Sequence, residues 1–299
     1  MRIISRLLSN AYFLLTMTTV MWAGNTIAGR LAIGNISPMA ITCLRWIFSF
    51  VLLAMLFPRA VSGAPKIVRE RPLYITLMAI LGFSAFNAVF YAAAQYTSAI
   101  NLGIMQSSTP LFVMLGAANF QGERIAPAQI AGLATGLIGV IIVASRGQLA
   151  VLQSLDFNRG DVMVLLVSAS YASYSLGLRS RPAEWNGLSF FAALSLMAAL
   201  TSLPLLAWEI ASGHSYWPTL KGWGVLAYVV LFPSLLAQIW YIKGIGLIGA
   251  ARAGLLFNAI PVFASIMAVL ILGEPFGWYH AAGLALVLGG ISWAERNRG

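Results

Sequence analysis

The chain has 299 residues, of which 60% are hydrophobic and 9% are charged, with a formal net charge of +10 and a mean hydropathy of +0.86. Soluble domains carry roughly 25% charged residues, so this chain cannot close a water-facing surface around one core. The basic residues are scattered among apolar segments, which argues against nucleic-acid binding. The lipid bilayer is therefore the expected surrounding of the chain.

Apolar runs between charged or Pro/Gly-rich breaks predict an all-α polytopic membrane protein with ten transmembrane helices. In chain order these spans cover roughly residues 11–33, 37–57, 73–96, 99–120, 127–144, 160–178, 187–208, 222–242, 250–272 and 278–294. The first run is too long for the apolar core of a signal peptide, so we expect it to stay in the mature chain. The longest break separates a first half, 1–145, from a second half, 160–299, by an outside linker, 146–159.

The basic residues also predict the orientation of the chain. With a cytoplasmic N-terminus, the inside loops and tails hold thirteen Lys and Arg side chains, and the outside loops hold Arg30, Arg146, Arg159 and Lys221. Cytoplasmic loops are enriched in Lys and Arg, so both termini are expected in the cytoplasm.

The chain repeats itself at an offset of 151 residues, which aligns 99–144 with 250–295. The matched pairs include Gly103 with Gly254, Pro110 with Pro261, Gly122-Glu123 with Gly273-Glu274, and Gly132 with Gly283. Each half holds five predicted spans, an odd number, so the second half must enter the membrane from the opposite side. Two inverted five-helix repeats are typical of transporters, which bind substrate between the halves.

Short motifs in both halves resemble the EamA-type pattern of the drug/metabolite transporter superfamily. They are Trp22-Ala23-Gly24-Asn25, Leu44-Arg45-Trp46, Thr109-Pro110-Leu111-Phe112, Gly122-Glu123 with Gly132, and, in the second half, Pro261, Leu272-Gly273-Glu274 and Gly283. The resemblance covers nearly the whole chain and implies ten spans and the export of small metabolites. Bacterial aromatic amino-acid exporters of the YddG type are one branch of this family, so the resemblance also implies the inner membrane of a bacterium.

Polar side chains inside the predicted spans are the candidates for a substrate site, because they are costly unless they face the bundle interior or a watered cavity. Asn87 and Tyr91 lie four residues apart and share one helical face. An offset of 149 residues places Trp22 on Tyr171. The predicted substrate-binding set is Trp22, Asn25, Arg45, Asn87, Tyr91, Tyr171, Tyr174, Gln238 and Tyr241. The alternative is that these side chains only hold helices together through hydrogen bonds.

Arg45 is the one basic residue well inside a span. An intramembrane Arg must face inward, where its planar fork could bind a substrate carboxylate. It could equally hold helix ends or backbone carbonyls together.

Four residues at matching positions of the halves are candidate hinges: Gly82, Pro110, Pro233 and Pro261. Proline removes a backbone hydrogen bond and kinks a helix, which rocking halves could use, although a static kink explains it equally well. Spans five and ten are rich in glycine and are expected to form a scaffold. Glu123 and Glu274 each precede a predicted helix, whose N-terminus a carboxylate would stabilise.

The expected function is export of small organic metabolites, with aromatic or other apolar amino acids as the preferred substrates. Other metabolite classes, such as nucleobases or drugs, and a passive channel-like pore remain alternatives. One cysteine, Cys43, and two distant histidines offer no catalytic or metal-binding pattern, so neither an enzyme nor a cofactor is expected. All eight acidic residues fall in loops, tails or span ends, which favours a uniporter over proton coupling. The expected partners are a small-molecule substrate and lipid, and the oligomeric state stays open.

Overall fold

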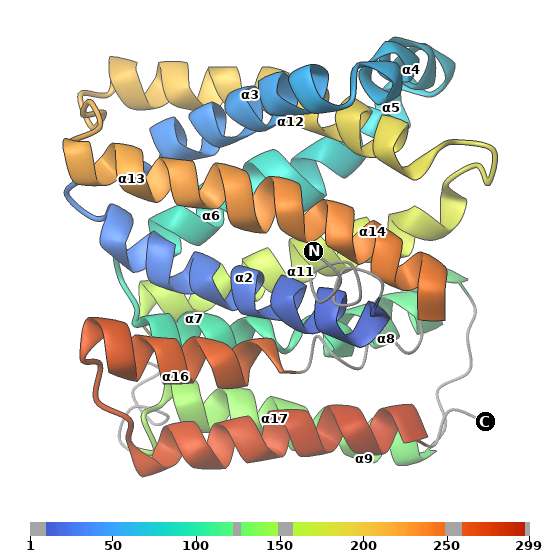
Figure 1. Cartoon of the computed structure of the whole chain (residues 1–299). Coiled ribbons are helices and arrows are strands. Elements are labelled where there is room, and N and C mark those ends of the chain that lie inside the picture. The colour runs from blue at the N-terminus through green and yellow to red at the C-terminus, as the bar shows by residue number, and fades with distance from the viewer. Residues whose placement is uncertain (1–9, 122–126, 149–157, 249–258, 297–299) are drawn as a thin grey trace.

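The computed structural model describes residues 10–121, 127–148, 158–248 and 259–296, and these ranges form a bundle of helices without strands (Figure 1). Within them, six helical segments are long and apolar enough to cross a membrane. They are Pro38–Leu56, Pro72–Ala93, Pro127–Ala144, Arg159–Ser180, Gly187–Ala211 and Leu220–Ile248. A shorter apolar helix covers Ile260–Leu272.

The first half contributes α2 (Ala11–Ala32), α3 (Pro38–Leu56), α4 (Pro58–Glu70), α5 (Pro72–Ala79), η1 (Ile80–Ser84), α6 (Ala85–Ala93), α7 (Ala99–Gln106), α8 (Thr109–Gln121) and α9 (Pro127–Ala144). The second half contributes α11 (Arg159–Gly177), η2 (Leu178–Ser180), α12 (Gly187–Ala211), α13 (Leu220–Val229), η3 (Val230–Leu236), α14 (Ala237–Ile248), α16 (Ile260–Leu272) and α17 (Trp278–Arg296).

Side-chain caps explain where several of these helices begin. The Asn10 side chain accepts a hydrogen bond from the Phe13 amide at 3.2 Å at the start of α2. Asn158 and Thr219 cap α11 and α13 in the same way, through their side-chain oxygens. The first amides of a helix have no partner within the helix, so an Asn or Thr before an apolar run stabilises that starting point.

The structure differs from the predicted elements in three places. Helix α4 occupies a stretch predicted as a loop, and it is too short to span a membrane. The predicted span 99–120 is two helices, α7 and α8, that are separated at Ser107 and Ser108. Helix α14 continues past Lys243, which was predicted to lie in a loop. The first residues of the ninth predicted span, Glu123 and most of the predicted linker lie outside the described residues.

Helices of the two halves pack against each other throughout the bundle. Helix α2 lies against α14 and α16, α3 lies against α12, and α11 lies against α6, α7 and α8. The pair α9 and α17 lies side by side at one edge, at the bottom of Figure 1. Contacts between the halves therefore surround the centre of the molecule.

The pair α9 and α17 is held by glycine. A methyl group built on Gly139 would lie 2.8 Å from the Gly283 carbonyl oxygen, and one built on Gly290 would lie 2.8 Å from the Gly136 amide nitrogen. The two backbones approach closely only because no side chain stands between them, as is usual for small residues between membrane helices. The glycines of the predicted scaffold spans thus form a helix contact.

Two π-helical segments occur at corresponding positions of the halves. Gly82 lies in η1 and Pro233 lies in η3, and these two residues are 151 positions apart. A π-helical turn widens the backbone and frequently marks a functional site. These segments border the polar side chains described next.

Candidate functional site

The centre of the bundle contains a buried guanidinium group that binds four side-chain oxygens. Arg45 Nη1 donates to Asn25 Oδ1 at 3.1 Å, to Asn87 Oδ1 at 2.8 Å and to the Tyr91 hydroxyl at 2.7 Å. Arg45 Nε donates to Ser234 Oγ at 2.6 Å. The Arg45 side chain comes from α3 and its partners come from α2, α6 and η3. We call these five residues the Arg45 cluster.

The Arg45 cluster is shielded from solvent and contains no acidic group. Arg45 is 5% exposed and Tyr91 is 2% exposed. Within the described part of the chain, ion pairs join Arg30 with Glu274 and Lys66 with Glu70, and neither involves Arg45. No described residue accepts a hydrogen bond from Nη2, the second terminal nitrogen of Arg45. The positive charge is thus surrounded by neutral groups, which are these four oxygens and the Trp46 ring, whose centroid lies 5.1 Å from Arg45 Cζ.

The partners of Arg45 are themselves held in place. Asn87 Nδ2 donates to the Phe83 carbonyl at 2.5 Å, and Ser234 Oγ donates to the Val229 carbonyl at 2.6 Å. Tyr91 donates to Asn25 Oδ1 at 3.0 Å. The carbonyls of Phe83 and Val229 lie in or next to the two π-helical segments, so the local backbone geometry orients the groups that bind Arg45.

Trp22 and Tyr241 form an aromatic pair near η3. The Trp22 indole Nε1 donates to the Pro233 carbonyl at 2.9 Å, and its ring centroid lies 5.4 Å from that of Tyr241. Gly24, two residues further along the chain, leaves room for Tyr228, because a methyl group there would collide with the Tyr228 hydroxyl. The Trp22-Ala23-Gly24-Asn25 motif therefore positions the Trp22 ring and the Asn25 side-chain amide, and its glycine leaves room for Tyr228 of α13.

Tyr171 and Tyr174 form a second aromatic group on α11. Their centroids lie 5.3 Å apart, and Phe83 packs edge-on against Tyr174 at 5.5 Å. A methyl group on Gly82 would lie 2.6 Å from the Tyr174 ring, so the glycine allows this ring to pack on η1. Phe83 thus contacts both groups, since its ring packs against Tyr174 and its carbonyl accepts the hydrogen bond from Asn87.

The remaining predicted residues occupy less central positions. Gln238 lies on α14 one turn after Ser234 and is half-buried. Pro110 is the second residue of α8 and Pro261 is the second residue of α16, where proline is tolerated because the first amides of a helix have no partner. Pro110 thus starts a helix instead of kinking a continuous one, and the prediction of a single kinked span was wrong.

Sequence reasoning missed Ser234, Phe83 and Trp46. A serine in an apolar run carries no signal of its own, Phe83 is indistinguishable from an ordinary packing residue, and Trp46 stands out only as part of the Leu44-Arg45-Trp46 motif. Trp46 lies on α3 beside Arg45, and its buried Nε1 has no hydrogen-bond acceptor among the described residues. Only the fold reveals that these residues border the Arg45 cluster.

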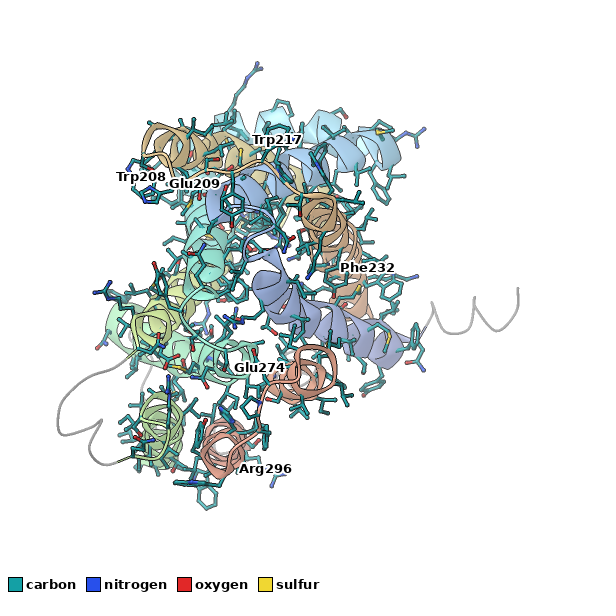
Figure 2. All side chains as sticks on the ribbon, turned by 90° about the vertical axis from the view of Figure 1, so that its left-hand side faces the viewer. Trp208, Glu209, Trp217, Phe232, Glu274 and Arg296 are labelled. Atoms are coloured by element: carbon teal, nitrogen blue, oxygen red, sulfur yellow. The ribbon has the colours of Figure 1, made fainter. Side chains whose placement is uncertain are left out.

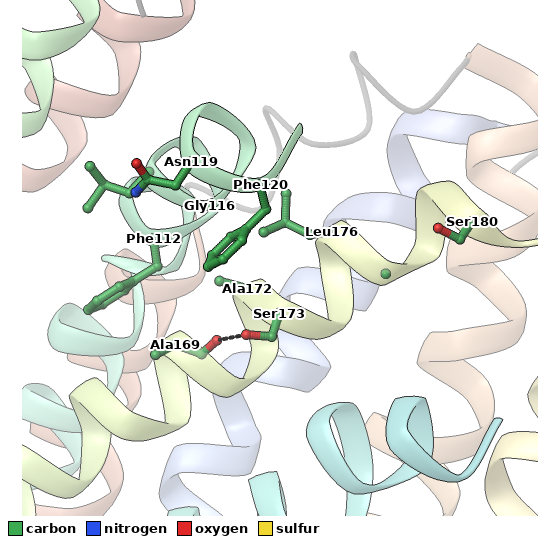
Figure 3. A pocket seen from close by; sticks show the side chains of 11 residues that line it. Phe112, Gly116, Asn119, Phe120, Ala169, Ala172, Ser173, Leu176 and Ser180 are labelled. Carbon is green, nitrogen blue, oxygen red and sulfur yellow. Dashed lines mark hydrogen bonds between the residues drawn. The ribbon is translucent and has the colours of Figure 1, made fainter. Parts of the chain in front are cut away.

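Two cavities among the described residues lie away from the Arg45 cluster. One, of about 590 Å³, is lined by residues of α8 and α11 that include Phe112, Asn119, Ala169 and Ser173 (Figure 3). The other, of about 610 Å³, lies where Phe57 and Arg59 meet Asn186 and Ser189.

A helical bundle with six segments able to cross a membrane, and with a charged, hydrogen-bonded cluster buried between the helices, defines an integral membrane protein with an internal polar site. The model of the EamA-like transporter family matches residues 9–145 and again residues 158–294. The chain therefore belongs to the EamA-like transporter family, and the family domain is present twice.

Curated relatives agree with this assignment. The chain is 24% identical to the transporter YyaM of Bacillus subtilis, over 96% of this chain and 93% of that protein. It is 24% identical to a probable terminal-alkyne amino-acid exporter of Streptantibioticus cattleyicolor, over 97% and 94%. It is also 24% identical to the aromatic amino acid exporter YddG of Ancylobacter novellus, over 78% and 79%. One crystal structure matches 97% of this chain and 99% of its own with a TM-score of 0.66 at 20% identity, which supports the fold.

Proposed function

We propose that the protein exports small organic metabolites, with aromatic and other apolar amino acids as its substrate class. The observation that carries the proposal is the buried Arg45, whose partners in the structure are all neutral. A guanidinium group held away from water without a counter-ion is costly and attracts an anion that fits its fork. A substrate carboxylate satisfies both conditions.

Binding of an amino acid would exchange partners within the Arg45 cluster. In the structure, Asn25 Oδ1, Asn87 Oδ1 and the Tyr91 hydroxyl accept hydrogen bonds from the guanidinium group. A substrate carboxylate that binds the guanidinium group of Arg45 would displace these three oxygens. These oxygens can then accept hydrogen bonds from the substrate ammonium group. The cluster thus offers complementary groups for both ends of a zwitterion, with no further charged residue needed.

The aromatic residues around the cluster favour an apolar substrate side chain. Trp22, Tyr171, Tyr174 and Tyr241 present rings that stack on or pack against a ring or a branched chain. Ligand sites typically combine such apolar walls with a few polar anchors. Two relatives are named as amino-acid exporters, in keeping with this class.

Transport would proceed by alternating access between two inverted five-helix repeats, covering 1–145 and 160–299, with ten membrane passes and both termini in the cytoplasm of a bacterial cell. The two π-helical segments support this mechanism, because they hold Gly82 and Pro233 beside the site at corresponding positions. Wide, irregular turns give each half a place to bend. No ion gradient is required, so substrate moves down its own gradient.

Uptake into proteoliposomes tests the substrate class. We expect saturable flux of phenylalanine, tyrosine, tryptophan and leucine, and at least about tenfold slower flux of their amides, which lack the carboxylate, corresponding to about 1.4 kcal/mol. Arg45→Gln should remove the difference between acid and amide. Equal transport of acids and amides by the unaltered protein would contradict the proposal, and flux that does not saturate would indicate a pore.

A further inference from the structure

Glu274 lies at a junction between the two halves. It follows Gly273, whose positive φ of 66° ends α16 and turns the chain. Its carboxylate accepts hydrogen bonds from the Ala99 amide at 2.9 Å and from the Ile100 amide at 3.1 Å. Glu274 therefore caps α7 of the other half, and the prediction that it stabilises the helix that follows it was wrong.

Arg30 adds two more helices to this junction. From the last turn of α2, Arg30 Nη1 donates to the carbonyls of Ala94 at 2.7 Å and Thr97 at 3.2 Å, where α6 ends. Arg30 Nε lies 3.6 Å from Glu274 Oε1. One carboxylate and one guanidinium group thus connect the end of α16 with α2, α6 and α7, and we call this pair the Arg30–Glu274 lock.

The lock lies at the end of the bundle that we assign to the outside. Figure 2 looks onto this end, where Glu274 lies between α16 and helices of the first half. The side chain of Arg30 is 33% exposed and that of Glu274 is 12% exposed, so water can reach the pair. The other described ion pair, Lys66 with Glu70, lies within α4 and connects no helices. The Arg30–Glu274 pair therefore differs from a surface ion pair in joining the two halves.

Both members of the lock recur in the sequence repeat. The offset of 149 residues that places Trp22 on Tyr171 also places Arg30 on Arg179, and the offset of 151 residues places Glu123 on Glu274. Glu123 lies outside the described residues. Because the α16 end carries Glu274 and α2 carries Arg30, any movement that separates these helices at the outer end must break the pair.

We propose that Arg30 and Glu274 are positioning residues of the transport cycle, which hold the outer end of the protein closed and separate when the central site opens to the outside. This inference rests on the proposed alternating access. If Glu274 only capped α7, it would need no guanidinium group beside it, and a neutral side chain such as Gln could form the same cap. The charge pair adds an attraction that water and salt can compete for once the ends move apart.

The test measures access from outside, independently of flux. The sole cysteine, Cys43, is replaced by alanine, and Ser265→Cys places a thiol on the buried face of α16. An impermeant thiol reagent is added outside. Glu274→Gln keeps an oxygen that can cap α7 but removes the charge, and we expect labelling to become about three- to tenfold faster. Arg30→Gln should give the same increase, and the double variant no more than either single one.

Three comparisons make this result decisive. Lys66→Gln, which removes the pair within α4, should leave the labelling rate unchanged. Added salt should speed labelling in the parent protein but not in Glu274→Gln, because only the parent retains the charge pair. Arg30→Lys keeps a charge without the fork and should lie between parent and Arg30→Gln.

Unchanged labelling in Glu274→Gln and Arg30→Gln, with a parent protein that transports, would overturn the lock. So would an equal rise in Lys66→Gln, or additive effects in the double variant, since these outcomes indicate general loosening. Failure of the proposed function has a different signature, because the parent would then show no saturable flux whatever the labelling rates.

Discussion

The Arg45 cluster and the contact between α9 and α17 hold helices together by opposite means. In the cluster, α3 is joined to α2, α6 and η3 through a buried charge and four side-chain oxygens. In the other contact, backbones touch at glycines, with Gly139 against Gly283 and Gly290 against Gly136. Glycine contacts bury no charge, and they show that this protein can join helices without that cost.

The difference indicates which region serves stability and which serves function. A buried Arg with neutral partners is an expensive way to hold helices, and replacing buried ionic groups with apolar side chains is often neutral or stabilising. The glycine contact has no such replacement at Gly139, Gly283 and Gly290, because a methyl group at each of these positions meets backbone atoms of the facing helix. Substitutions in the two regions should therefore separate folding from transport.

The largest expected effect on folding concerns the glycine contact. Gly290→Leu should reduce the yield of folded protein at least about tenfold, because overpacking typically costs about 1–3 kcal/mol and more where backbone must move. Gly289→Leu is the matched control, since no atom lies within 4 Å of a methyl group built there. The measurement is the monodisperse fraction after detergent extraction. Equal yields for the two variants would remove the scaffold role.

The largest expected effect on transport concerns the charge in the Arg45 cluster. Arg45→Met should lower transport per folded molecule about a hundredfold, or about 2.7 kcal/mol, with little change in yield. Asn87 and Ser234 keep their bonds to the Phe83 and Val229 carbonyls, so their donors stay satisfied. Flux and thermal unfolding are measured on the same preparation. If the two fall in parallel, Arg45 acts as a helix clamp, and the proposed substrate contact fails.

A glycine inside the site should behave unlike those of the α9–α17 contact. Gly82→Ala would push a methyl group against the Tyr174 ring, which is a side chain that can shift. We expect the apparent affinity for aromatic amino acids to weaken about three- to tenfold, or ~0.7–1.4 kcal/mol, while yield stays unchanged. Gly224→Ala in α13, where nothing lies within 4 Å, is the control. A loss of yield without a change in affinity would assign Gly82 to packing.

The same contrast explains what could be read from the sequence. Arg45, Asn25, Asn87 and Tyr91 stand out because polar groups in apolar spans are rare and costly, and the structure brings all four together. Ser234 was missed because its partner is identified only by the packing of η3 against α3. Local pattern predicts which residues are unusual, whereas their partners depend on the fold.

Two elements show where that limit lies. The stretch that forms helix α4 lacks a long apolar run and so resembles a loop, although the spacing of Val61, Ala64 and Ile67 is that of an amphipathic helix. Glu274 was assigned to its own neighbouring helix, whereas it caps α7, 175 residues earlier in the chain. A periodicity search could have found the first, but no local pattern could have found the second.

The smallest expected effect is that of a pH gradient, which should not drive accumulation of substrate. Neither the Arg45 cluster nor the glycine contact between α9 and α17 contains a carboxylate that could carry a proton. Among the described acidic residues, Asp161 and Glu209 are buried, but at helix ends. Asp161 accepts a hydrogen bond from Thr97 Oγ1 at 2.5 Å, and Glu209 accepts one from Ser37 Oγ at 2.6 Å. Each thus has a fixed partner in the bundle.

The measurement is substrate flux into proteoliposomes with and without an imposed pH gradient, at equal substrate concentration on both sides. We expect the internal and external concentrations to remain equal within error, because a uniporter only dissipates the substrate gradient. Sustained accumulation that collapses with the pH gradient would contradict this. Asp161→Asn and Glu209→Gln would then show whether a carboxylate at a helix end couples proton movement to transport.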